Sequence, residues 1–422
     1  MPDAIPGRPR RWDRLYIFLA ATYLAEGFSG VAYEPVSYLL KNDLHLSAGQ
    51  SAMFVWWMTF PFLIKPLFGF LSDLVHIGRM RRKPQIMIAS GVAAAAWAIL
   101  ARMHHYDYGM VLALLVLVNV GMCASDVVCE AVMVEQGQKD RATGAYQAVK
   151  VGALYAALAA TGIGGGWLYA HVPLRLIFAM TALFTLMIFV GAAFSRERDF
   201  PAKGTARLAV LKPFLSDRRF WILGVVVFLW SFYPFLGTAQ FYYQSEVLKF
   251  GPVFIGFLGT LSGVLGVAAA ALYARVAGRV WSTERLVKGA VLFGCPLSLL
   301  FVFYLGPASV IAVTVVWGLV GVFFRLALMD LAAQFCPPYA EATAFAVYMA
   351  AFDFAEAGSN AVGGRLYDWL QAVFTRTPNP AYAAVVALSA VGACCTLSCW
   401  WLLPYLNFET AAREASPASI FR

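Results

Sequence analysis

Long apolar segments constrain what this chain can fold into more than any other feature of its sequence. One of them runs from Ser51 to Leu71, and the charged residue Asp73 follows it. A helix needs about 20 residues to cross the hydrocarbon core of a bilayer, so this segment is long enough to span a membrane. Similar segments recur along the whole chain and predict an all-α membrane protein.

The apolar segments fall into two groups of six. Residues 195–219 lie between the groups, are rich in Arg and Lys, and are expected to form a cytoplasmic linker. We therefore predict an N-terminal six-helix bundle over residues 1–194 and a C-terminal six-helix bundle over residues 220–422. The twelve predicted helices lie near residues 14–40, 50–74, 84–103, 107–134, 143–170, 173–194, 220–248, 252–278, 283–304, 307–335, 341–370 and 380–406.

The composition agrees with this prediction and excludes several other classes. Hydrophobic residues make up 61% and charged residues 13% of the 422 positions, whereas about 25% of residues are charged in soluble proteins. The sequence shows no nucleotide-binding loop, nucleophile elbow or metal-ligand spacing. We therefore expect no enzyme activity, no cofactor and no metal site. The seven cysteines show no paired framework, so we expect them to be free and buried.

Lys and Arg are distributed unevenly between the predicted loops. If both termini are cytoplasmic, 23 of these residues lie in cytoplasmic segments and 5 in outer segments. Because cytoplasmic loops retain Lys and Arg, the count predicts a multi-pass protein of the cell (inner) membrane with both termini in the cytoplasm. The net charge of +9 sits in these loops, so the expected partner is the lipid bilayer and not nucleic acid.

The first six predicted helices carry five ionisable side chains at membrane depth, where charge is costly and each such residue is a functional hypothesis. Lys65, Asp126 and Lys150 lie at similar depths when 1.5 Å is counted per residue. Glu130 follows Asp126 by four residues and shares its helix face. These groups are either a proton-carrying acid with basic partners or a neutralised cluster that locks the helices. Glu26 lies near the midplane without a basic partner at its depth, which suits a proton or substrate site.

The last six predicted helices carry a second set of charges. Arg325 and Asp353 lie at depths that predict an ion pair across a cavity wall. Glu356 follows on the same helix as Asp353 and is a further candidate for binding substrate or protons. Arg365 and Asp368 lie nearer the outer end of their helix and are expected to lie at the membrane–water interface.

The loop after the second predicted helix has a distinctive pattern and is expected to act in gating. Gly69 lets a neighbouring helix approach, and Asp73 can face a helix N-terminus or an arginine. The basic residues that follow can anchor the loop to lipid headgroups. The basic residues alone also fit any cytoplasmic loop. The pattern consists of Gly69, Asp73, Gly78, Arg79, Arg82 and Lys83.

This spacing resembles the loop between helices 2 and 3 of the major facilitator superfamily. With Lys65 and Pro66 in front, the long gap between the acid and the second glycine is similar to the loop of the folate-biopterin transporter family. Three further stretches resemble the same family, although Lys150 and Asp353 stand where Arg and Asn are expected. They are ASDVVCEAVMVEQ with TGAYQAVKVGALYAALAATGIGGG, FYPFLGTAQFYYQSEVLKFGPVFIGFLGTLSGVLGVAAAALYAR, and DLAAQFCPPYAEATAFAVYMAAFDFAEAGSNAVGGRL.

The resemblance implies the major facilitator fold, with two pseudo-symmetric halves, and the uptake of folates, pterins or related compounds together with protons. We therefore predict a monomeric secondary active transporter that moves a small anionic aromatic metabolite by alternating access. The alternatives are a permease for peptides, muropeptides or siderophores, and a non-transporting membrane assembly factor.

Two further sets of residues bear on this prediction. Four glycines of the fifth predicted helix are expected to mark close contact with a neighbouring helix: Gly162, Gly164, Gly165 and Gly166. Eight aromatic rings could stack on a flat ligand or serve only in packing: Tyr23, Tyr33, Trp56, Trp57, Tyr233, Phe241, Tyr242 and Tyr243.

Overall fold

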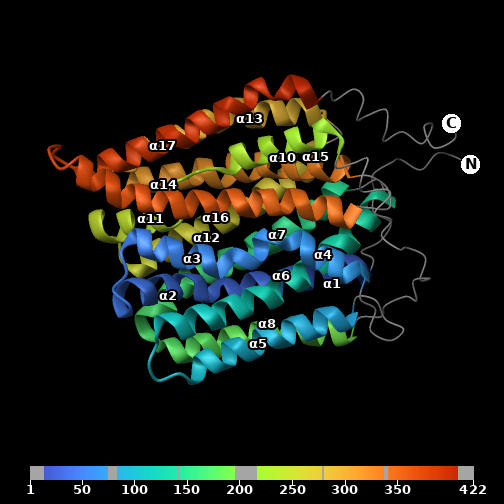
Figure 1. The fold of residues 1–422 in the computed structure, drawn as a ribbon, viewed down its shortest axis with the longest axis horizontal. Helices are drawn as coiled ribbons and strands as arrows, with labels where there is room; N and C mark the ends of the chain where they lie inside the picture. Colours follow the sequence, from blue (N-terminus) through green and yellow to red (C-terminus); the bar gives the residue numbers. More distant parts are fainter. Residues whose placement is uncertain are drawn as a thin grey trace, which may run out of the picture.

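Long helices that lie side by side along one axis form the described part of the protein (Figure 1). The computed structural model describes residues 14–74, 83–139, 143–194, 216–277, 280–336 and 341–406, and these ranges contain no β-strand. Within these ranges, nine helices are long and apolar enough to cross a membrane. The expected all-helical chain is therefore confirmed for the described residues, whereas the count of twelve spans stays a prediction.

The three other predicted spans are helical, but they are interrupted or more charged. The first continues from α1 through short 3-10 and π turns to Asp43, and the seventh is broken over residues 232–237. The eleventh is continuous but carries several charged residues. The elements of the first six predicted spans are α1 (Arg14–Ser29), α2 (Tyr33–Tyr38), α3 (Ala48–Leu63), α4 (Lys65–Leu74), α5 (Lys83–Arg102), α6 (Tyr108–Lys139), α7 (Thr143–His171) and α8 (Leu174–Phe194).

The second group of helices contains the most pronounced break. The expected continuous helix over residues 220–248 is wrong, because Pro234 and Gly237 interrupt it, and Gly237 has a φ of 91° that favours glycine. The helices of this group are α10 (Arg218–Ser231), α11 (Thr238–Tyr242), α12 (Pro252–Val276), α13 (Thr283–Leu299), α14 (Pro307–Val316), α15 (Val322–Gln334), α16 (Glu341–Val373) and α17 (Pro380–Ser398).

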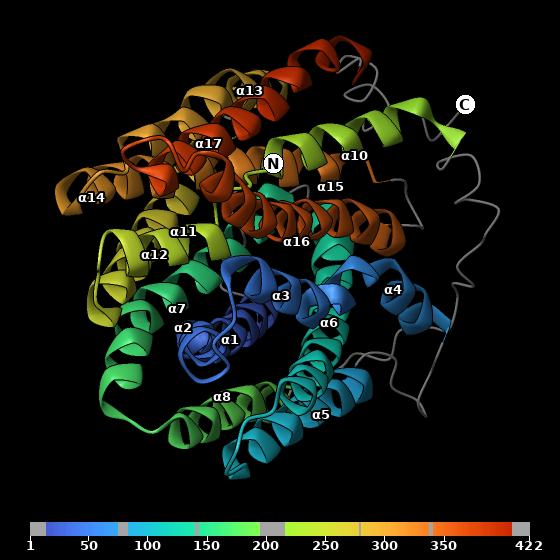
Figure 2. The ribbon, with the colours of Figure 1, turned by 60° about the vertical axis from the view of Figure 1, so that its left-hand side comes forward.

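The two groups of helices lie next to each other and meet mainly along two helix pairs. Helices α1 to α8 gather on one side and α10 to α17 on the other (Figures 1 and 2). Where the groups meet, α7 packs along α12 and α3 packs against α16 (Figure 2). The apolar core also crosses this boundary, because Val134 and Val151 of the first group pack into the core of the second.

Glycines allow the close approach of α7 and α12. A Cβ atom added at Gly162 or Gly166 would overlap the backbone of α12. One added at Gly165 would lie 3.1 Å from the carbonyl oxygen of Val31, whereas Gly164 has nothing within 4 Å. The prediction that these glycines mark helix contacts is therefore confirmed for three of them and wrong for Gly164.

A proline kink shapes the span that carries the first buried lysine. Pro61 lies inside α3, and the helical pattern breaks at Ile64 before α4 begins at Lys65. Proline lacks the backbone N–H that would continue the helix, which explains the bend. All seven cysteines are free, as expected, but the expected burial is wrong for three of them: Cys394 is exposed, and Cys295 and Cys395 are partly exposed.

Candidate functional site

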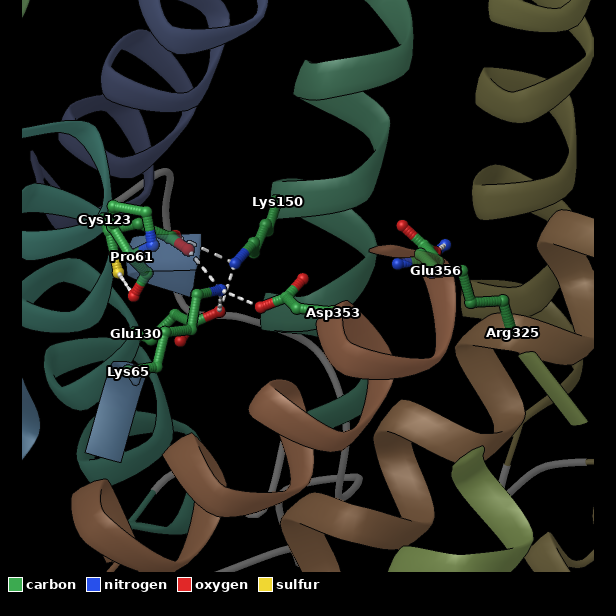
Figure 3. A network of polar contacts seen from close by, with 9 residues as sticks. Pro61, Lys65, Cys123, Glu130, Lys150, Arg325, Asp353 and Glu356 are labelled. Carbon is green, nitrogen blue, oxygen red and sulfur yellow. Dashed lines mark hydrogen bonds and ion pairs between the residues drawn. The ribbon is translucent and has the colours of Figure 1, made fainter. Parts of the chain in front are cut away.

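Five ionisable side chains meet inside the molecule and come from both groups of helices (Figure 3). The Nζ atom of Lys65 lies 2.9 Å from Oδ2 of Asp126 and 3.0 Å from Oδ2 of Asp353. The Nζ atom of Lys150 lies 3.0 Å from Oδ1 of Asp126 and also contacts the carboxylate of Glu130. We call these five residues the buried ion cluster. The predicted single layer of Lys65, Asp126 and Lys150 is therefore confirmed.

Each member of the cluster follows from the local helix geometry. Lys65 is the first residue of α4, directly after the kink, and points at α6. Asp126 and Glu130 are four residues apart on α6, so both can reach Lys150 on α7. Asp353 comes from α16, and its contact with Lys65 ties the second group of helices to the first.

The cluster contains three carboxylates and only two ammonium groups. The side chains of Lys65 and Asp126 are 5% and 4% exposed, whereas that of Asp353 is 23% exposed. Atom Oε2 of Glu130 is buried without a hydrogen-bond partner among the described residues. Charges out of contact with water must be paired, so one carboxylate in excess leaves a place where the cluster can take up a proton.

Helix α1 places two more groups against the cluster. The Nζ atom of Lys150 lies over the ring of Tyr23, 4.9 Å from its centroid. Glu26 is one turn further along α1 and lies within electrostatic reach of Asp126 and Lys150. In the described part of the chain its carboxylate makes no direct hydrogen bond or ion pair. Glu26 is therefore a second acidic group close to the cluster and separate from its ion pairs.

A separate ion pair lies within the second group of helices (Figure 3). Arg325 of α15 contacts Glu356 of α16, and their side chains are 34% and 48% exposed. The predicted pair of Arg325 with Asp353 is therefore wrong. Helix α16 contacts both α4 and α15, and Asp353 faces the first of these while Glu356 faces the second. Depth along a helix could not show which neighbour each side chain faces.

Two cavities lie beside these charges. The larger has a volume of about 430 Å³, and none of the described residues that line it is charged. Its polar and aromatic lining includes Tyr33, Trp97, Asn119, Phe241, Tyr242 and Asn360. The smaller has a volume of about 300 Å³, and its lining includes Tyr155, Tyr233, Trp317, Arg325, Glu356 and Asn360. Both volumes lie in or near the range of small-molecule sites, and Gly237 and Asn360 line both cavities.

The predicted aromatic set divides between the cavities and the packed interior. Tyr33, Phe241 and Tyr242 line the larger cavity and Tyr233 lines the smaller. The remaining four do not line either cavity and contact other side chains: Tyr23, Trp56, Trp57 and Tyr243.

The amide side chains of the cavities are not among the predicted site residues. Asn119 is a polar residue inside a long apolar run, and this signal could have identified it. Asn360 lies among several polar residues of α16, so its place in the sequence does not distinguish it from them.

Only part of the expected gating loop can be described. Gly78, Arg79 and Arg82 lie outside the described residues. Asp73 lies near the end of α4, and the structure describes its backbone only. Lys83 begins α5 and donates a hydrogen bond to the carbonyl of Ala193 at the end of α8.

Gly69 is the remaining member of the expected gating loop. A Cβ atom added there would lie 3.7 Å from Val127 and 3.8 Å from Ala346. These are ordinary contacts, so the close approach at this position does not require glycine.

At the opposite end of the bundle, polar contacts join the turn before α3 to the second group of helices. Asp368 accepts hydrogen bonds from Ser47 Oγ at 2.9 Å and from the N–H of Gly49 at 2.8 Å. Lys41 lies 3.6 Å from the carboxylate of Glu246. Asp368 therefore lies where the two groups of helices meet, and it fixes the start of α3.

Comparisons with known proteins agree with this architecture. The family model of the Major Facilitator Superfamily matches residues 15–359. The chain is also similar to a folate-biopterin transporter of Synechocystis sp., with 26% identity over 407 residues that cover 90% of this chain and 80% of the relative.

A second relative is folate transporter 2 of Plasmodium falciparum. It is 24% identical over 273 residues, which cover 62% of this chain and 58% of that protein. The similarity to this relative therefore extends over less than two thirds of its length.

Proposed function

Because the chain belongs to the Major Facilitator Superfamily and is homologous to folate-biopterin transporters, we propose that it is a proton-coupled secondary transporter of folate- or pterin-like metabolites. It is a multi-pass integral membrane protein and a transporter, not an enzyme. The proposal includes twelve spans arranged as two six-helix bundles over residues 1–194 and 220–422. It also places both termini in the cytoplasm and the protein in the cell membrane.

The contact between Lys65 and Asp353 is the observation that best supports this mechanism. It is the point at which the buried ion cluster joins the two groups of helices. A proton that binds Asp353 removes the negative charge that faces Lys65, while Lys65 keeps its contact with Asp126. The link between the groups then weakens without leaving a buried ammonium unpaired. A transporter that uses protons to drive alternating access requires such a coupling of protonation to the contact between its two groups of helices.

The two cavities supply the space for the substrate. The larger offers aromatic rings and uncharged hydrogen-bonding groups, which suit a flat heteroaromatic ring. The smaller offers the guanidinium of Arg325, which suits a carboxylate. The members of the buried ion cluster do not line either cavity. In this proposal the cluster therefore carries protons, and the cavities carry the metabolite.

Uptake into proteoliposomes tests the proposal. Purified protein is reconstituted, and the accumulation of labelled folic acid and biopterin is measured with and without an inward proton gradient. We expect the gradient to raise accumulation of at least one compound, and a proton ionophore to abolish the increase. Accumulation of peptides, muropeptides or siderophores alone would favour the permease alternative. A broad metabolite screen without any gradient-dependent accumulation would contradict the proposal.

A further inference from the structure

The broken span over residues 232–237 lies where the two cavities meet. Tyr233 and Leu236 line the smaller cavity, Thr238 and Phe241 line the larger, and Gly237 lines both. Irregular backbone at membrane depth is tolerated only where it is buried in protein or lines a cavity, and broken helices mark binding sites in many transporters. The break therefore lies at a position where a transporter can bind a ligand with its backbone exposed to a cavity.

Asn360 of α16 holds this break in place and also lines both cavities. Its Oδ1 accepts a hydrogen bond of 2.7 Å from the backbone N–H of Thr238, the first residue of α11. A Cβ atom added at Gly237 would lie only 2.6 Å from the same oxygen. Any larger residue at Gly237 would therefore collide with Asn360, in addition to straining a φ of 91°. We call Gly237 and Asn360 the joint.

The joint separates two chemically different spaces. On one side, the described residues of the larger cavity carry no charge, so they cannot neutralise a carboxylate. On the other side, Arg325 and Glu356 give the smaller cavity one cation and one anion. With Oδ1 held by Thr238, the amide NH₂ of Asn360 is the group that can donate to a ligand between them.

We infer that the joint and Arg325 determine specificity, by binding ligands that have an uncharged planar head in the larger cavity and a carboxylate tail at Arg325. This inference rests on the proposed function and refines it. The tail carboxylate takes the place of Glu356 at the guanidinium. Glu356 has a half-exposed side chain, so it can remain hydrated in the cavity after the exchange. A ligand without a tail uses the larger cavity alone.

Direct binding to the purified full-length protein tests the inference with two probes. Folic acid has a pterin head and a tail that ends in carboxylates, whereas biopterin has a pterin head with a short hydroxylated side chain and no carboxylate. Asn360→Asp keeps the oxygen that Thr238 requires, removes the donor and adds negative charge at the joint. We expect Asn360→Asp and Arg325→Gln each to weaken folic acid at least tenfold more than biopterin, as measured by calorimetry.

Asn119→Asp is the matched control, because it adds the same charge to the larger cavity away from the joint. We expect it to weaken both probes by the same factor. Equal losses for both probes in Asn360→Asp and Arg325→Gln would overturn the inference but leave the proposed function intact. Binding of neither probe by the unmodified protein would overturn both. Arg325→Gln keeps the hydrogen bond between Thr238 and Asn360 at the start of α11. If Asn360→Asp fails to fold, the comparison of the two probes with Arg325→Gln alone therefore tests the inference.

Discussion

The buried ion cluster and the pair of Arg325 with Glu356 are both ionic contacts between long helices, yet they differ in exposure. The lysines of the cluster are 5% and 8% exposed at the side chain, whereas Arg325 and Glu356 are 34% and 48% exposed. Removing one partner of a buried pair costs about 3–5 kcal/mol, whereas exposed pairs contribute about 0–1 kcal/mol. The same type of contact should therefore be structurally essential in one place and replaceable in the other.

This difference assigns separate tasks to the two regions. A ligand cannot displace the partners of Lys150 without burying an unpaired charge, so the cluster can exchange little more than protons. Arg325 lies in a cavity wall, so its partner can be exchanged for a ligand carboxylate while Glu356 remains hydrated. Proton coupling and ligand recognition would then depend on different side chains, which mutations can separate.

The largest effect is expected from Lys150→Met. This change leaves Asp126 and Glu130 buried with only Lys65 to neutralise them, so we expect a loss of about 3–5 kcal/mol in the free energy of unfolding. Lys288→Met is the matched control, because Lys288 pairs with Glu284 at the surface and is 50% exposed; its loss should be below about 1 kcal/mol. Equal losses in detergent unfolding would show that burial does not distinguish the cluster.

A double-mutant cycle of Asp126→Asn with Lys150→Met should give the next largest effect. The two side chains are in contact at 3.0 Å, so we expect a coupling free energy of about 1–3 kcal/mol in unfolding measurements. Each single change should strongly reduce uptake, and the double variant should recover stability without recovering uptake. Recovery of uptake together with stability would mark Asp126 and Lys150 as a structural pair with no role in transport.

A smaller change in stability is expected from Asp353→Asn. The cluster then holds two carboxylates and two ammonium groups, so no buried charge is left without a partner, and we expect the loss in the free energy of unfolding to stay well below the ~3–5 kcal/mol of a broken buried pair. Uptake should lose its dependence on the proton gradient, while exchange of substrate across the membrane continues. Asp368→Asn, on the same helix but bonded to Ser47 and Gly49, should retain the gradient dependence. Gradient-driven uptake by the Asp353 variant would exclude this residue as the proton carrier.

The sequence predicted more of the cluster than of the cavity pair, for a geometric reason. The rise of 1.5 Å per residue fixes the depth of a side chain once the ends of its helix are known. Lys65, Asp126 and Lys150 belong to one group of helices, and matching their depths was sufficient to bring them together. Depth could not place Asp353 or Arg325, because their partners depend on how α16 is rotated against α4 and α15.

The break at the joint was missed for a different reason. Pro234 and Gly237 are a visible breaking signal within residues 220–248, but the length of the apolar run favoured one continuous helix. A run of apolar residues reports burial in the membrane and not helical continuity. The hydrogen bond from Thr238 to Asn360 joins residues 122 positions apart, so no local pattern could have shown what stabilises the break.

The smallest change in stability is expected from Arg325→Gln, and its comparison with Lys65→Gln gives the most direct test of the difference between the two regions. Both changes replace a cation with an amide and leave a carboxylate behind. The carboxylate of Glu356 faces a cavity and can be hydrated, so we expect a loss below about 1 kcal/mol. Asp126 would lose one of its two cations at a site that is 4% exposed, so Lys65→Gln should cost several times more. Equal losses in unfolding measurements would mean that Arg325 is as strongly desolvated as the cluster, and a ligand carboxylate could not then replace Glu356.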